Sequence, residues 1–142
     1  MTTTQAIESL VDKAVARRRA LLESEASDAY RLVNGASDGL SGLVIERLGS
    51  VLIVQFHEGR LDVEPEAAAP VVESLLSRLG LRAAYAKYFV RDRSELSEEQ
   101  GASHSDAKPW IGRPVESKIV VREGASQFII RPYDGFSYGL FL

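Results

Sequence analysis

Residues 30–49 read YRLVNGASDGLSGLVIERLG, and the apolar run VLIVQFH follows at 51–57. Three glycines fall within eight residues of this stretch: Gly35, Gly39 and Gly42. Because glycine permits positive φ angles, the chain is expected to turn sharply here after an extended segment at 30–33. The β-branched residues that follow predict two strands joined by a turn at Gly49-Ser50. A polar, glycine-shaped loop that leads into a buried hairpin is therefore the centre of the predicted fold.

Composition excludes several classes of function. The chain has 142 residues, the length of one domain, and its hydrophobic content of 45% is ordinary for a globular protein with a core. It has no cysteine, which excludes disulfides, thiolate metal sites and a cysteine nucleophile. Two histidines do not make a metal site by themselves; we expect His57 to be packed or at a strand edge and His104 to be solvated.

Charge and hydropathy bear on location and partners. No apolar run of about 18 residues and no signal peptide are present, which predicts a cytoplasmic protein that makes no membrane contact. The net charge is −3, whereas a free-standing nucleic-acid-binding domain usually carries a basic excess. Any RNA binding must therefore come from a local basic patch or from a further domain.

Two helices are predicted on either side of the central hairpin. Apolar residues recur at helical spacing over 5–23, and again over 68–79. Pro70 is expected in or near the first turn of the second helix, and Gly80 is expected to end it. Arginines 17–19 either lay their stems over apolar surface or contact phosphate; the sequence leaves both readings open.

The strands complete a small α+β fold. Alternation over 83–90 predicts a third strand with its small residues toward a helix. Two further strands, 118–121 and 127–131, are joined by a Glu-Gly-Ala turn. The order predicts a two-layer strand-strand-helix-strand-strand domain with a mostly antiparallel sheet, an N-terminal helix and a C-terminal β-hairpin.

Changes in composition divide the chain. Residues 1–28 are expected to be an N-terminal helix and linker, and 29–131 a central α+β domain. Within it, the polar stretch at about 92–109 predicts a mobile loop. Residues 132–142 end on an apolar Leu-Phe-Leu, which favours burial, and are read as the start of a further part of a longer protein.

The residues alone offer two readings of the loop. Its backbone N–H groups could cradle a phosphate, or it is a structural turn in which Asp38 accepts backbone N–H groups. Cations beside the aromatic residues 85 and 88 could hold phosphate and stack bases, or protect a solvated strand edge. Asp38 and Glu46 lie on different predicted elements, with nothing visible that would shift a pKa, so they are not assigned as an acid–base pair. The RNA-binding candidates are Arg31, Asn34, Gly35, Asp38, Gly39, Gly42, Lys87, Arg91 and Arg93.

The segment RLVNGASDGLSGLVIER resembles the hallmark segment of class I S-adenosylmethionine-dependent large-subunit rRNA methyltransferases of the 5-methylcytosine type. The matching residues are Arg31, Leu32, Gly35, Asp38, Gly39, Leu40, Gly42, Leu43, Glu46 and Arg47. Later pieces agree in order: Ile111-Gly112 with Pro114, VVREGASQFII, and the closing YGLFL.

The resemblance implies that this chain is a central domain that helps to position ribosomal RNA. S-adenosylmethionine and the catalytic residues would then belong to a missing C-terminal cofactor-binding methyltransferase domain, of which residues 132–142 would be only the start. The chain itself is expected to bind no cofactor and no metal. An alternative from another class is a non-enzymatic interaction module or homodimer, pairing through the apolar stripe at 7–22 and the Phe141-Leu142 end. A free-standing small-molecule enzyme lacks a nucleophile and base.

Overall fold

A computed structural model describes residues 3–58, 63–90 and 97–135 of the chain. The strands in this part are β1 (Ala29–Asn34), β2 (Leu43–Leu48), β3 (Val51–His57), β4 (Ala83–Phe89), β5 (Ile111–Gly112), β6 (Ile119–Glu123) and β7 (Ser126–Ile130). The first five form one sheet in the order β1-β2-β3-β4-β5, and β6 pairs with β7 as a separate hairpin. The α+β class, the central hairpin β2–β3 and the C-terminal hairpin are confirmed.

The main sheet is mixed because of one crossover. Strands β1, β2 and β3 pair antiparallel, as do β4 and β5, while β3 and β4 pair in parallel. Parallel neighbours need a long connection, and here a helix supplies it. The remaining pairs give the mostly antiparallel sheet that the sequence predicts.

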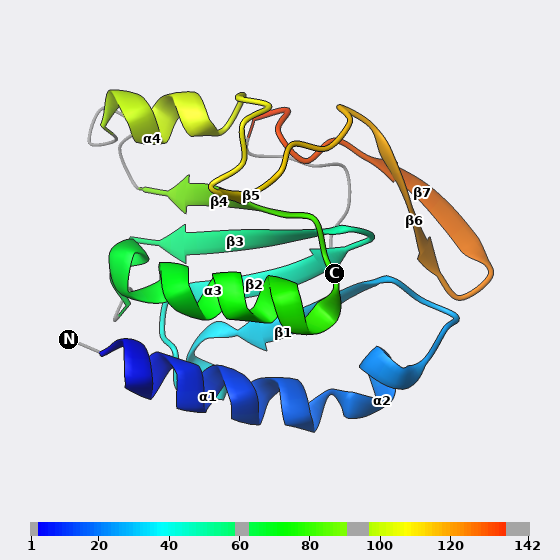
Figure 1. Ribbon diagram of the computed structural model, residues 1–142, viewed down its shortest axis with the longest axis horizontal. Coiled ribbons are helices and arrows are strands. Elements are labelled where there is room, and N and C mark those ends of the chain that lie inside the picture. Colours follow the sequence, from blue (N-terminus) through cyan, green and yellow to red (C-terminus); the bar gives the residue numbers. More distant parts are fainter. Residues whose placement is uncertain (1–2, 59–62, 91–96, 136–142) are drawn as a thin grey trace.

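The helices in the described residues are α1 (Thr4–Arg17), α2 (Arg19–Glu23), the short 3₁₀ helix η1 (Gly35–Asp38), α3 (Pro65–Leu79) and α4 (Glu98–Ser103). Figure 1 shows α1 and α3 side by side on one face of the sheet, with the hairpin β6–β7 projecting to one side. The chain leaves α3 through Gly80 in the left-handed conformation (φ 66°), as predicted.

Three features of the helices differ from the sequence prediction. The helix expected over 5–23 breaks at Arg18, where φ is −107° and ψ is 20°. Pro70 lies inside α3 rather than in its first turn, because the helix already begins at Pro65. The stretch expected to be a loop contains α4, whose start is fixed by a capping box between Ser97 and Gln100.

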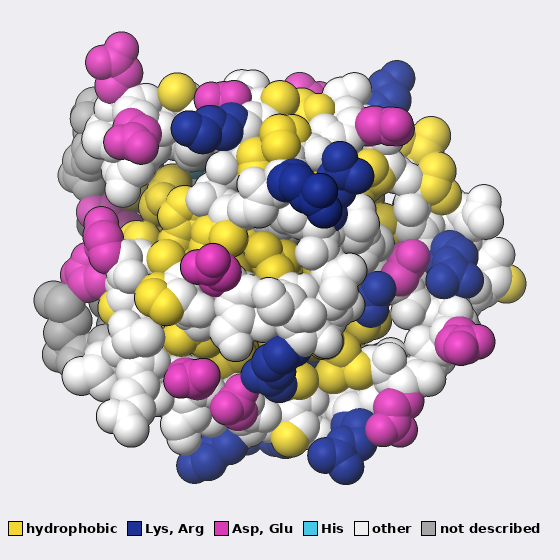
Figure 2. All heavy atoms as spheres, in the orientation of Figure 1, with side chains coloured by type: hydrophobic (Ala, Val, Ile, Leu, Met, Phe, Trp, Pro, Cys, Tyr) yellow, Lys and Arg dark blue, Asp and Glu magenta, His cyan; other side chains and the backbone are white. Residues whose placement is uncertain are grey.

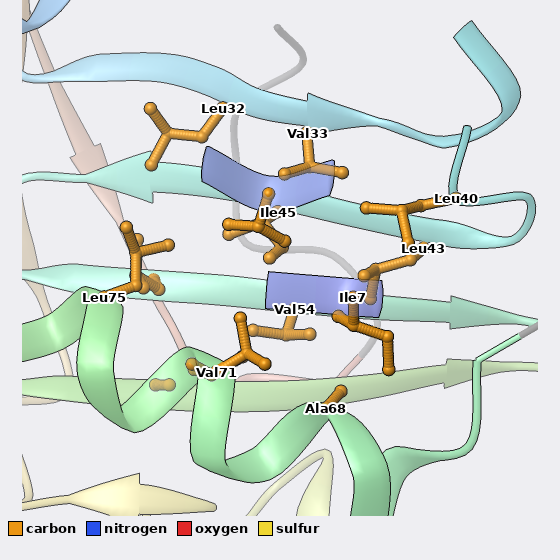
Figure 3. Close-up of a cluster of buried hydrophobic side chains, with 14 of the residues drawn as sticks. Ile7, Leu32, Val33, Leu40, Leu43, Ile45, Val54, Ala68, Val71 and Leu75 are labelled. Carbon is orange, nitrogen blue, oxygen red and sulfur yellow. The ribbon is translucent and has the colours of Figure 1, made fainter. Parts of the chain in front are cut away.

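Two apolar cores lie on the two faces of the main sheet. Figure 3 shows the larger one, where side chains of α1 and α3 meet those of β1, β2 and β3. The small residues Ala84 and Ala86 of β4 face this helix side, as predicted. The smaller core lies under the β6–β7 hairpin, where Val121 and Ile130 cover the other face of the sheet. Burial of each large aliphatic side chain contributes about 1.5–3 kcal/mol to folding.

Several expectations lie outside the described residues. Arg91, Arg93 and the end of the chain from 136 onward are among them. The domain boundaries drawn from composition stay predictions. None of the helices in the described part is both long and apolar enough to cross a membrane.

Candidate functional site

The loop between β1 and β2 is fixed at its base and open at its tip. After β1, one turn of η1 ends at Gly39, whose φ of 77° is left-handed. The amide of Leu40 donates to the carbonyl of Gly35 at 3.0 Å, and the Leu40 side chain is fully buried. Ala36 and Ser37 at the tip are exposed. The bend is therefore anchored in the core but presents its tip to solvent.

Asp38 ties this loop to the end of α1. Its carboxylate is buried and accepts two hydrogen bonds from Arg18, at 3.1 and 2.9 Å, and one from Arg17. Its Oδ2 also accepts the backbone N–H of Asn34 at 2.6 Å. Burial by itself would raise the pKa of Asp38, but the hydrogen bonds from Arg18 and Asn34 and the charge of Arg18 hold this pKa below its ordinary value. The expectation that nothing shifts the pKa of Asp38 is therefore wrong, because Arg18 is distant in sequence. Asp38 accepts a backbone N–H group, as the structural reading of the loop requires.

A polar network continues from the loop across the sheet. Arg31 Nη1 donates to Asn34 Oδ1 at 2.9 Å, and its Nε and Nη2 donate to Glu46 Oε2 at 3.2 and 2.9 Å. Gln55 Nε2 donates to Glu46 Oε1 at 3.1 Å. The ring of His57 lies 2.9 Å from Gln55 Oε1 through its Nε2. The network thus runs from the end of α1, through the loop, to the end of β3.

The carboxylates of this network are buried, whereas its guanidinium groups are partly exposed. The side chains of Asp38 and Glu46 are only 2% and 1% exposed, whereas those of Arg17 and Arg31 are 56% and 34% exposed. With Arg18 included, three guanidinium groups meet two carboxylates among the described residues, which gives this described set one more positive than negative charge. Because the negative groups lie beneath, the surface beside the loop tip is cationic. This set of Arg17, Arg18 and Arg31 around the loop is called the arginine surface below.

The structure brings together most of the predicted site residues. Those at the loop and its flanks are Arg31, Asn34, Gly35, Asp38, Gly39 and Gly42. For Arg17 and Arg18 the sequence suggested either packing over apolar surface or contact with phosphate. Neither interpretation included an ion pair with Asp38. The signal that could have found them is a buried acid in the loop, which requires cationic partners.

Lys87 corrects the expectation of a surface cation on β4. It is fully buried, and its Nζ donates to the carbonyls of His104 at 3.1 Å and Gly135 at 2.6 Å. Burial lowers the pKa of Lys87 to about 8, against an opposing effect of Asp134. Lys87 therefore joins two segments of the chain on the sheet and does not stand at the surface.

The histidines have structural surroundings. His104 is buried rather than solvated, because its Nε2 accepts the backbone N–H of Tyr88 at 3.0 Å. His57 is packed, as predicted: its ring stacks on Phe89 with centroids 4.7 Å apart. Among the described residues, no group of three or more His, Asp or Glu side chains is placed to hold a metal ion.

The chain is similar in fold and in sequence to proteins that are named methyltransferases. It superposes on a candidate S-adenosylmethionine-dependent methyltransferase from Streptococcus mutans with a TM-score of 0.76 at 16% identity, covering 100% of this chain and 34% of that one. A second solved structure, a candidate methyltransferase complexed with S-adenosylhomocysteine, gives a TM-score of 0.73 at 15% identity, covering 99% and 33%. These likenesses show the fold.

Sequence relatives carry a more specific name. Ribosomal RNA large subunit methyltransferase I from Escherichia coli O127:H6 is 24% identical over 124 residues, and the protein of that name from Cronobacter sakazakii is 27% identical over 123 residues. Each match covers 86% of this chain but 29% of the relative. The chain therefore spans less than a third of the length of these relatives. No family model matches it.

Proposed function

We propose that this chain is the RNA-positioning central domain of an S-adenosylmethionine-dependent rRNA methyltransferase. The methyl donor and the reacting groups belong to a C-terminal methyltransferase domain, and the chain itself contributes no chemistry. Its partners are ribosomal RNA and that domain, and it works in the cytoplasm. The names of the relatives support the class, and the arginine surface supports the RNA contact.

The main support for this proposal is that the cations of the arginine surface are more exposed than the carboxylates that pair with them. A phosphodiester backbone is attracted by exposed cations, and here the cations are exposed while the carboxylates beside them are buried. Arg17 is more than half exposed, and Arg18 keeps Asp38 paired without it. Arg17 can therefore contact a phosphate without loss of the fold. The exposed loop tip at Ala36 and Ser37 lets an RNA strand approach closely.

Affinity for RNA tests this proposal. We expect Arg17→Gln to weaken binding of the chain to transcribed large-subunit rRNA several-fold, because one phosphate contact is lost. The matched control is Arg113→Gln, which makes the same charge change just after β5, at the opposite edge of the sheet. Equal affinity of wild type and Arg17→Gln would remove the RNA contact from this surface.

Self-association is a second candidate, supported by a different feature. The apolar stripe of α1 is buried, since Ile7 and Val11 pack in the larger core, so this stripe is not available to a partner. On the hairpin, however, Val120 and Ile129 lie opposite each other and are 58% and 54% exposed. Light scattering of the chain, with Val120→Thr as a variant, tests whether this pair joins two copies. A monomer at all concentrations counts against it.

A further inference from the structure

A cleft of about 800 Å³ lies between the start of α3, strand β4 and helix α4. In Figure 2, a hollow between α4 and α3 is floored by hydrophobic side chains and has acidic side chains beside it. The cleft is on the β4–β5 side of the sheet, whereas the arginine surface is on the β1 side. It is therefore a separate feature of the molecule.

Aromatic rings form the floor of this cleft. Buried Phe56 stacks on Tyr88 with ring centroids 5.5 Å apart, and its ring is perpendicular to that of Trp110, with centroids 5.6 Å apart. Tyr88 and Trp110 are only partly buried, and both line the cleft. Faces of aromatic rings attract cations, tryptophan most strongly, and the flat guanidinium of arginine also stacks on them.

The charges around the floor are mainly negative. Among the described residues that line the cleft, Glu66, Glu99 and Asp106 are acidic and Lys108 is the one cation. None of these carboxylates takes part in a salt bridge in the described part of the chain. The pKa of the Tyr88 hydroxyl is raised, first by burial and then by Glu66 and Glu99, which places the field of both carboxylates at the ring. A phosphate-bearing ligand is disfavoured here, and a cation is favoured.

We propose that this cleft binds the guanidinium group of an arginine side chain presented by a partner protein. The plane of the guanidinium would stack on the ring of Trp110, because Tyr88 already stacks with the rings of Phe56 and His104. Glu66 and Glu99 would balance its charge. An aromatic face combined with carboxylates fits arginine better than a compact ammonium ion, because arginine offers both a flat surface and several donors. The site does not depend on the proposed RNA contact.

Trp110 makes the test direct, because it is the only tryptophan of the chain. The 142-residue chain is titrated at constant ionic strength with a capped Gly-Gly-Arg-Gly-Gly peptide, while tryptophan fluorescence is recorded. We expect a saturable change. The double variant Glu66→Gln/Glu99→Gln should weaken binding by about threefold to tenfold, because two favourable charges are lost. The matched control Glu73→Gln/Glu98→Gln changes one residue of each of the same two helices outside the cleft and should bind as wild type does.

Two comparisons separate arginine from other cations. The same peptide with Lys in place of Arg should bind more weakly, and spermidine should saturate only at higher concentration than the arginine peptide. Tighter saturation by spermidine would overturn the assignment to an arginine side chain in favour of a free polyamine. No saturable fluorescence change, or equal affinity of the two double variants, would overturn the site itself.

Discussion

Arg18 makes a bidentate contact with Asp38: its Nη1 donates to Oδ1 at 3.1 Å and its Nη2 donates to Oδ2 at 2.9 Å. The same Nη1 donates to the carbonyl of Ala14 at 3.0 Å, within the last turn of α1. Arg18 is also the residue at which the long helix breaks. The loop after β1 and the end of α1 are thus held together mainly by Arg18. Arg17 donates to the same carboxylate but keeps more than half of its side chain exposed.

The buried carboxylate should be essential for stability. Asp38→Asn leaves two arginines without their charge partner, and we expect it to lower the free energy of unfolding by about 2 kcal/mol. The control is Asp12→Asn, in an exposed pair with Arg78, which should cost less than about 1 kcal/mol. Urea denaturation of both variants makes the comparison; equal losses would mean that Asp38 is not a key contact.

The lowered pKa of Asp38 gives this effect a pH dependence. A carboxyl whose pKa is lower in the folded than in the unfolded chain adds stability above the unfolded value of 3.8, and the stability is lost as pH falls through the folded value. The difference in stability between wild type and Asp38→Asn should therefore shrink below about pH 4. If the difference in stability between wild type and Asp38→Asn stays constant below about pH 4, the lowered pKa of Asp38 is contradicted.

Lys87 should make the free energy of unfolding depend on pH in the alkaline range. Its pKa is about 8 when folded against 10.5 for the ordinary side chain, so between these values the unfolded chain binds more protons and stability rises with pH. The gain from this group is about 2 kcal/mol between pH 8 and pH 10. Lys87→Met should lose this rise, whereas Lys118→Met, at an exposed position, should keep it. If the free energy of unfolding rises equally with pH in wild type and in Lys87→Met, the lowered pKa of Lys87 is contradicted.

Two glycines should respond to alanine in opposite directions. Gly112 has φ +94°, and a Cβ there would lie 2.3 Å from the carbonyl oxygen of Arg82, so Gly112→Ala should cost about 2 kcal/mol and loosen β5. Gly101 lies in α4 with nothing within 4 Å of its would-be Cβ, so Gly101→Ala should stabilise by about 0.5–1 kcal/mol. Thermal unfolding followed by Trp110 fluorescence measures both. Stabilisation by Gly112→Ala would show that β5 does not pair as described.

Local patterns predicted the elements that local forces determine. The hairpin at Gly49-Ser50, the alternation of β4 and the glycine end of α3 were all readable, because turn geometry and periodicity act over a few residues. The break at Arg18 was not, because the helical pattern continues through it and the partner that accompanies the break is Asp38, 20 residues away.

Contacts distant in sequence also decided the site. The alternation of β4 suggested that Lys87 is an exposed cation. It is buried instead, and its Nζ donates to the carbonyls of residues 17 and 48 positions further along the chain. His104 sits in a polar stretch, but the capped helix α4 before it carries its ring to the backbone of Tyr88. The loop glycines could be predicted because the turn itself requires positive φ angles. Arg31 was a candidate for another reason, as one of a set of cations near the hairpin.

The salt dependence of RNA binding tests the RNA contact of the arginine surface most directly. Each phosphate contact contributes about 0.7–0.9 to the slope of log K against log salt concentration. We predict that Arg17→Gln reduces the magnitude of this slope by about that amount and that Arg113→Gln leaves it unchanged. An unchanged slope for Arg17→Gln, or an equal reduction for Arg113→Gln, would contradict the assignment of RNA binding to the surface beside the β1–β2 loop.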